Sequence, residues 1–100
     1  MTEKEKRASQ RFKARPGDNV NYVEGAGAIR DLSLEGVFVL DAEPLPVGSI
    51  VRFSIRLGNE TVMFQGIVQR CVEKQGMGIQ FKEMSKEARR RLRLHIATTL

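Results

Sequence analysis

Apolar and polar residues alternate in short runs between residues 18 and 83, and turn-forming residues separate the runs. The clearest run covers residues 50–57, where every second residue is apolar: Val51, Phe53, Ile55 and Leu57. Because successive side chains of a strand point to opposite faces, this run predicts a strand with one face in a core. Further strands are expected over 20–22, 28–32, 36–40, 61–72 and 77–81.

The breaks between these runs are rich in glycine and proline. Residues 25–27 hold two glycines and are expected to end the first strand, while 43–48 hold two prolines and predict a loop. Residues 58–59 suit a tight turn, and Gly66 predicts a bend or bulge inside the long strand.

The hydrophobic period changes near the C-terminus. An apolar residue there recurs at every fourth position: Met84, Ala88, Leu92 and Ile96. This spacing places them on one face of a helix, for which Ser85 is a suitable N-cap. We therefore expect a helix over 84–98. Several strands followed by one amphipathic helix predict an all-β domain, an antiparallel barrel or curled sheet with the helix packed across it.

Charge divides the chain into three parts. Residues 1–15 carry a net charge of +4, residues 16–81 carry −3 and residues 82–100 carry +4. Basic ends around an acidic middle suggest an anionic partner, which a nucleotide, a nucleic acid or an acidic protein surface would supply. For the C-terminal cluster, the simpler interpretation is that its cations keep a helix face solvated.

Several classes of function find no support in the residues. The single Cys71 and the single His95 fall in different predicted elements, so neither a nucleophile with its base nor a metal site is expected. Asp31 and Glu35 are the nearest approach to a carboxylate pair, and binding or capping suits them better than acid–base chemistry. We expect no enzymatic activity, no cofactor and no membrane insertion, and the charged N-terminus predicts a cytoplasmic protein.

Two motifs carry chemistry. In the first, Arg7 and Arg11 lie four residues apart on the basic N-terminal arm. Arginine presents a planar fork of donors that suits phosphate oxygens and the O6/N7 edge of guanine. Taken alone, the pair also fits a solvated basic arm.

The second motif covers residues 31–36, Asp-Leu-Ser-Leu-Glu-Gly. If Leu32 and Leu34 anchor the segment to the core, Asp31 and Ser33 face solvent together with the glutamate at 35. An aspartate can accept hydrogen bonds from guanine N1 and N2, and Gly36 allows a sharp turn and close approach of a ligand. A polar turn in which Asp31 and Ser33 bond their own backbone is the alternative.

Together, Arg-x-x-x-Arg and Asp-x-Ser-x-x-Gly resemble the signature of the PilZ domain family. The resemblance extends to Phe12 and to residues 36–39, 44–49, 66–68 and 78–81. It implies a six-stranded antiparallel β-barrel with a C-terminal helix that binds cyclic di-GMP, a bacterial second messenger. By position, Arg7 and Arg11 would hold phosphates and guanine edges, Asp31 and Ser33 would bind a guanine, and Gly36 would keep the turn open. Lys6 stands where family members that take a ligand dimer have a further arginine, so the number of bound ligands stays open.

The resemblance also yields a hypothesis for signalling. A single domain is expected, with a flexible ligand-binding arm over 1–12, a barrel over 13–83 and the helix over 84–98. The arm would order when the nucleotide bridges it to residues 31–33, and a separate protein partner would sense the change. Two alternatives remain: an adaptor that binds proteins without using the ligand, and a basic barrel for single-stranded nucleic acid. The second is disfavoured because most of the few aromatic residues occupy predicted core positions.

Overall fold

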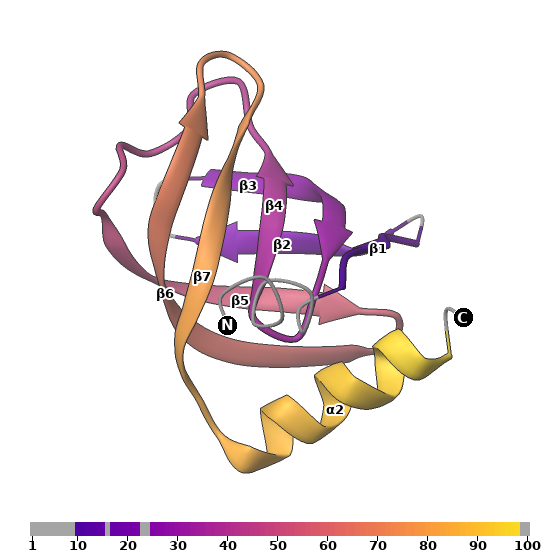
Figure 1. The fold of residues 1–100 in the computed structure, drawn as a ribbon. Coiled ribbons are helices and arrows are strands. Elements are labelled where there is room, and N and C mark those ends of the chain that lie inside the picture. The colour runs from indigo at the N-terminus through magenta and orange to yellow at the C-terminus, as the bar shows by residue number, and fades with distance from the viewer. Residues whose placement is uncertain (1–9, 16, 23–24, 99–100) are drawn as a thin grey trace, which may run out of the picture.

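The computed structural model describes residues 10–15, 17–22 and 25–98 (Figure 1). These residues form seven strands and one helix: β1 (Phe12–Lys13), β2 (Asn19–Tyr22), β3 (Gly25–Leu32), β4 (Gly36–Leu40), β5 (Ile50–Leu57), β6 (Glu60–Val72), β7 (Gly76–Met84) and α2 (Lys86–Ala97).

Six of the strands close into a barrel. Neighbours pair antiparallel in the order β3-β2-β5-β6-β7-β4, and β4 pairs back onto β3. The short β1 is an extra strand, in which Phe12 and Lys13 pair with Leu32 and Asp31 of β3. The expected six-stranded antiparallel barrel is therefore confirmed. In Figure 1, β2, β3 and β5 run across the view, β6 first follows β5 and then curves upward, and β7 runs beside this upper part of β6.

The apolar faces of the strands fill the barrel. In β5, Phe53, Ile55 and Leu57 are buried, whereas Arg56 is exposed, as the alternation predicts. The ring of Phe53 stacks on that of Phe64 in β6, with centroids 5.1 Å apart. Aromatic and branched side chains from facing strands thus build one continuous core.

The prediction that residues 25–27 end a strand was wrong. Gly25 begins β3, and Gly27 pairs with Val20 of β2. A Cβ added at Gly27 would lie 2.2 Å from the carbonyl oxygen of Leu40. Glycine here permits a close approach of two backbones within the barrel, and it does not break the strand.

The glycines at 58 and 66 behave as predicted. Gly58 has a φ of 64° in the tight turn between β5 and β6. At Gly66 the pairing of β6 with β7 shifts register: Gln65 pairs with Glu83 and Gly66 with Phe81, so the irregularity lies at Gly66 and its extra residue, Lys82, is in β7. A Cβ at this position would lie 2.6 Å from the Cγ2 atom of Ile79, which explains why the bend uses glycine.

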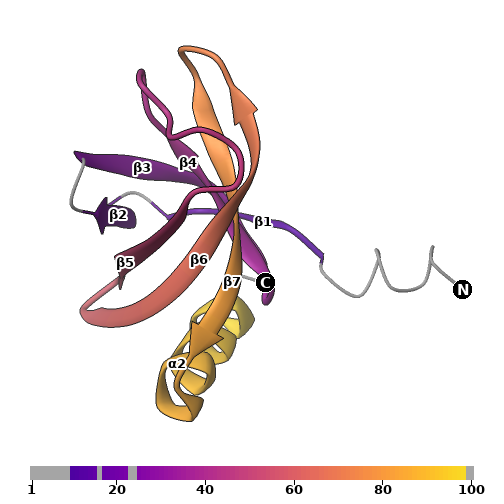
Figure 2. The ribbon, with the colours of Figure 1, turned by 90° about the vertical axis from the view of Figure 1, so that its left-hand side faces the viewer.

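The C-terminal helix covers one end of the barrel (Figure 2). Ser85 caps α2, since its Oγ accepts a hydrogen bond from the amide of Ala88 at 3.0 Å. Ala88, Leu92 and Ile96 are buried against the core, while Met84 is the last residue of β7. In the described part of the chain, α2 falls short of the length and hydrophobicity that a membrane-spanning helix needs.

Candidate functional site

A β-bulge in β3 turns two neighbouring polar side chains to the outside of the barrel. The register of β3 against β4 shifts between Ile29 and Asp31, so Arg30 is an extra residue in the strand. Ile29 and Leu32 are buried in the core, and Arg30 and Asp31 both lie on the outer face. A regular strand would have pointed one of these two side chains inward.

Asp31 is held by arginines on both sides. The Nε atom of Arg11 donates to Oδ1 of Asp31 at 2.7 Å, and Nε of Arg30 donates to Oδ2 at 2.6 Å. Partial burial alone would raise the pKa of Asp31. The hydrogen bonds and positive charges of Arg30 and Arg11 outweigh that effect and lower its pKa below the ordinary value of 3.8. Asp31 is therefore an ionised acceptor near neutral pH.

The prediction that Ser33 faces solvent was wrong. Ser33 is fully buried, and Leu34, which was expected to anchor the segment, is 36% exposed. The cause is the tight turn between β3 and β4: the Ser33 amide donates to the carbonyl of Gly36 at 2.9 Å. The Ser33 hydroxyl accepts from the amides of Glu35 and Gly36, each at 3.1 Å. Its bonds to its own turn match the alternative interpretation of this motif.

Arg11 joins the two sequence motifs. Besides its contact with Asp31, its Nη1 donates to the Oγ of Ser33 at 3.3 Å. The predicted residues Arg11, Asp31 and Ser33 thus form one cluster. Lys6 and Arg7 lie outside the described residues.

Gly36 closes the turn against β7. It is buried, and a Cβ there would lie 2.4 Å from the carbonyl oxygen of Ile79. Its φ is not positive, so the reason for glycine is the close approach of two strands.

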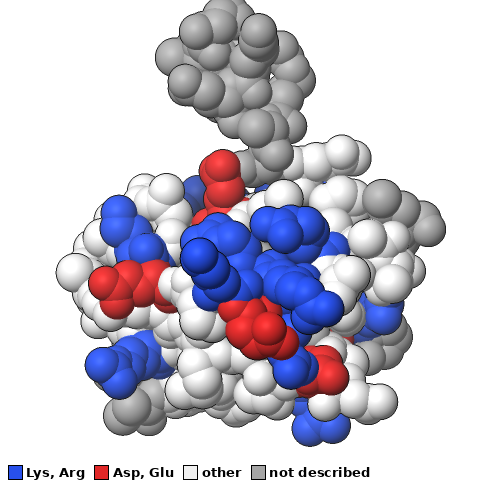
Figure 3. Space-filling model, turned by 90° about the horizontal axis from the view of Figure 1, so that it is seen from below, with Lys and Arg blue, Asp and Glu red and all other residues white. Residues whose placement is uncertain are grey.

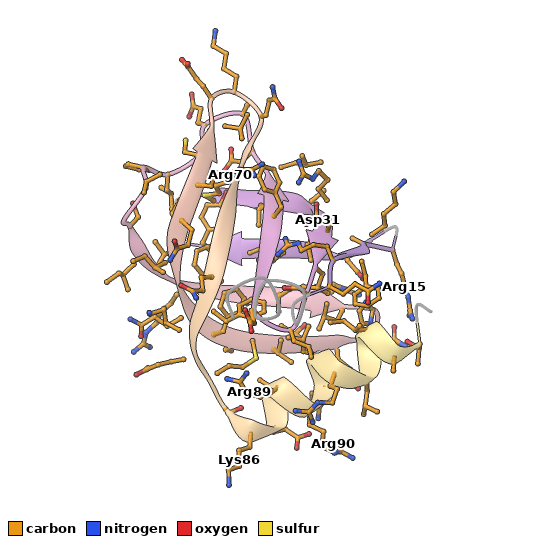
Figure 4. The ribbon with its side chains drawn as sticks, in the orientation of Figure 1. Arg15, Asp31, Arg70, Lys86, Arg89 and Arg90 are labelled. Carbon is orange, nitrogen blue, oxygen red and sulfur yellow. The ribbon has the colours of Figure 1, made fainter. Side chains whose placement is uncertain are left out.

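Besides Arg30, three further residues that the sequence analysis did not select complete the site. Asp31 pairs with Phe38, Phe38 with Gly78, and Gly78 with Arg70, so these positions form a row across four strands. A second bulge, at Gln69, brings Arg70 to the outer face. Figure 4 labels Asp31 and Arg70, on β3 and β6.

Phe38 is covered by guanidinium groups. The guanidinium carbon of Arg30 lies 3.8 Å from the centre of its ring, and that of Arg70 lies 5.4 Å away. Phe38 is only 4% exposed, although it does not belong to the core cluster that contains its neighbours Val37 and Val39. The ring is therefore buried beneath two cations, and their planar guanidinium groups are what a planar, anionic ligand would meet.

Two depressions adjoin at this row. One, of about 490 Å³, is lined by residues that include Arg30, Asp31, Phe38 and Arg70. The other, of about 300 Å³, lies over the turn that contains Ser33 and Gly36. Arg11 and Gly78 line both, so the two form a continuous surface of the size that small-molecule sites have. Among the described residues, no group of three histidine, cysteine or acidic side chains is placed to hold a metal ion.

Solved structures with the same fold include proteins of known ligand and role. The chain resembles Bacillus subtilis inhibitor of motility (MotI/DgrA) with a TM-score of 0.75, at 21% identity over 92% of this chain and 50% of that one. It resembles Escherichia coli YcgR, solved in complex with c-di-GMP, with a TM-score of 0.73, at 20% identity over 92% of this chain and 45% of that one. The chain thus spans about half the length of these two proteins.

A third similar structure covers a domain of comparable size. It is the PilZ domain of CeSA from a cellulose-synthesizing bacterium, with a TM-score of 0.61, at 22% identity over 90% of this chain and 98% of that one. A comparison with curated protein sequences gives no match. The PilZ domain family matches residues 4–98, which is nearly the whole chain. The chain therefore belongs to the PilZ domain family.

Proposed function

We propose that this domain binds cyclic di-GMP on the outer face of the barrel and acts as a receptor, with no catalytic step. The observation that carries the proposal is the contact of Arg11 with both Asp31 and Ser33, since it unites the two motifs that the family resemblance assigns to the ligand. The similar fold of YcgR, solved with c-di-GMP, supports the choice of ligand.

Asp31 would bind a guanine base by exchanging partners. A carboxylate has about four acceptor positions, and Arg11 and Arg30 use part of them. Guanine N1 and N2 would replace Arg30 at Oδ2, while Arg11 keeps Oδ1. The released Arg30 guanidinium would then be available for a phosphate or for stacking on the base.

Of the other site residues, some would contact the ligand directly and others would hold the contacting residues in place. Arg11 would bind phosphate or a guanine edge, with Arg7 and Lys6 of the arm joining it when the arm orders. Ser33 is buried and already accepts three hydrogen bonds, so it would position Arg11 and the turn. Gly36 would keep the turn packed on β7. Arg70, whose guanidinium group lies over the buried ring of Phe38, would form the platform beside the base.

Isothermal titration of the domain with cyclic di-GMP tests this proposal. Asp31→Asn keeps the shape of the side chain but replaces an acceptor by a donor, so we expect affinity to fall at least about tenfold, as also for Arg11→Ala and Arg7→Ala. Arg56→Ala removes an exposed arginine of β5 outside the site and is the matched control. Cyclic di-AMP should bind poorly, because adenine lacks the N1 and N2 donors that Asp31 accepts.

The same experiment separates the alternatives. An absence of heat with wild-type protein would refute ligand binding and favour a ligand-independent adaptor. Tight, salt-dependent binding of a single-stranded oligonucleotide would favour the nucleic-acid alternative. Binding that survives Arg11→Ala and Asp31→Asn would refute our assignment of the site.

A further inference from the structure

A groove with no part in the proposed nucleotide site lies beside the start of α2. Its volume is about 600 Å³, larger than either depression at Asp31, and it shares no lining residue with them. Strands β5, β6 and β7 form one wall, and Ser85 and Arg89 form the other.

The groove exposes an apolar side chain where the strand pattern calls for a polar one. Met63 is 62% exposed on the outer face of β6, between the polar residues Thr61 and Gln65 of the same face. Its cross-strand partner is Ser54 of β5. The half-buried Met84 adds further apolar surface at the end of β7. Methionine adapts its shape to different partners, and exposed methionines are common on protein-binding surfaces.

Cations surround this apolar floor. Arg52, Lys82 and Arg89 line the groove with a single acid, Glu83, and the described residues give these three cations no ion pair. By contrast, Arg90 and Arg91 of α2 form ion pairs: Arg90 with Glu87, and Arg91 with Glu60 and Glu87. In Figure 4, Arg89 lies on the strand side of α2, whereas Lys86 and Arg90 point away from the strands. Figure 3 shows basic side chains gathered on this end of the molecule.

We propose that this groove docks an acidic segment of a partner protein that carries one or two apolar side chains. The apolar side chains would contact Met63 and Met84, and carboxylates would pair with Arg52, Lys82 and Arg89. Single-stranded nucleic acid fits less well, because the one aromatic residue lining the groove, Phe64, is buried and offers no stacking platform. Through this contact, a receptor that binds its ligand without a catalytic step would act on another protein, and this part of the inference rests on the proposed function.

Methyl NMR of the complete chain tests this proposal. The probe is a synthetic peptide in which glutamates flank two leucines, added up to millimolar concentration, and the control peptide has lysine in place of each glutamate. We expect the acidic peptide to shift the methyl signals of Met63 and Met84 and to leave that of Met77, which is buried in the core, unchanged. No shift at Met63, or equal shifts with the lysine peptide, overturns the proposal.

Charge variants add a second readout. Arg52→Glu combined with Arg89→Glu should weaken the peptide at least about tenfold, whereas Arg90→Glu on the opposite side of α2 should change affinity less than about twofold. Equal losses of peptide affinity in both variants would contradict specific binding of the peptide in this groove. A single-stranded oligonucleotide that shifts Met63 more than the peptide does would reassign the groove to nucleic acid. Asp31→Asn should leave peptide binding intact, so failure of the nucleotide proposal is recognised separately.

Discussion

The Nε2 atom of His95 lies 2.8 Å from a carboxylate oxygen of Asp18, although 77 residues separate them. Both side chains are nearly buried, with 9% and 1% of their surfaces exposed. Asp18 also accepts from the amides of Arg15 at 3.3 Å and Gly58 at 3.1 Å. One carboxylate thus ties together the segment before β2, the β5–β6 turn and the last turn of α2.

Asp18→Ala should therefore destabilise the fold strongly. The change leaves the amide of Gly58 and the ring of His95 without this acceptor in a buried place, which we expect to lower the free energy of unfolding by about 2–4 kcal/mol. Urea denaturation followed by circular dichroism measures the loss. Glu73→Ala, at the exposed tip between β6 and β7, is the control and should change stability by less than about 0.5 kcal/mol. Equal stability of both variants would contradict the role assigned to Asp18.

Asp31 should make stability depend on acid pH. Its pKa in the folded chain is lowered below the ordinary value of 3.8, so its pairing with Arg30 and Arg11 stabilises the fold above that pH. The stabilisation is lost as pH falls through the lowered pKa, because both states then bind the proton. Both arginines are about half exposed, so the effect should be about 1 kcal/mol or less.

The measurement compares wild type with Asp31→Asn by urea denaturation over a range of pH. We expect the variant to be the less stable protein at pH 7 and the difference to shrink toward zero below the lowered pKa. A difference that stays constant with pH would mean that the ionised carboxylate contributes nothing.

The sequence predicted an antiparallel barrel or curled sheet because its regular strands alternate cleanly, and the resemblance to a family selected the six-stranded barrel. Residues 50–57 have one buried apolar face, and the period of four after residue 83 marks the helix. The resemblance to a family assigned Arg11, Asp31 and Ser33 to one ligand, whereas each motif alone also fitted a simpler interpretation. These three residues form one cluster by direct hydrogen bonds, which the sequence did not predict, and their roles in ligand binding stay a prediction.

The rest of the site depended on irregularities that alternation cannot predict. The bulges at Arg30 and Gln69 each turn two consecutive side chains outward, which no period-two pattern contains. Phe38 lies in a continuous apolar run, so its outward direction could not be told from the sequence. Ser33 is buried and Leu34 is exposed, the reverse of the prediction, because the chain turns directly after Leu32 and does not continue as a strand.

Two glycines of the site should respond differently to a methyl group. A Cβ at Gly36 would lie 2.4 Å from the backbone of Ile79, so Gly36→Ala must push β4 away from β7 and should cost about 2–4 kcal/mol of stability. A Cβ at Gly78 would meet only side chains at 3.6 Å and 3.7 Å, so Gly78→Ala should change stability by about 1 kcal/mol or less. Thermal and urea denaturation of the two variants compare them directly, and a larger loss at Gly78 would contradict the packing argument.

Arg70 should bind the nucleotide in two ways, by stacking its planar guanidinium group on the base and by its positive charge. It lies over the outer-face ring of Phe38, on the opposite end of the row from Asp31, where a purine bound to Asp31 would extend. A lysine keeps the charge but cannot stack, so Arg70→Lys should recover little of the affinity that Arg70→Ala loses. We expect both variants to bind cyclic di-GMP at least about tenfold more weakly than wild type in isothermal titration. Full recovery by lysine would show that charge alone matters, and unchanged binding by Arg70→Ala would exclude this end of the row from the site.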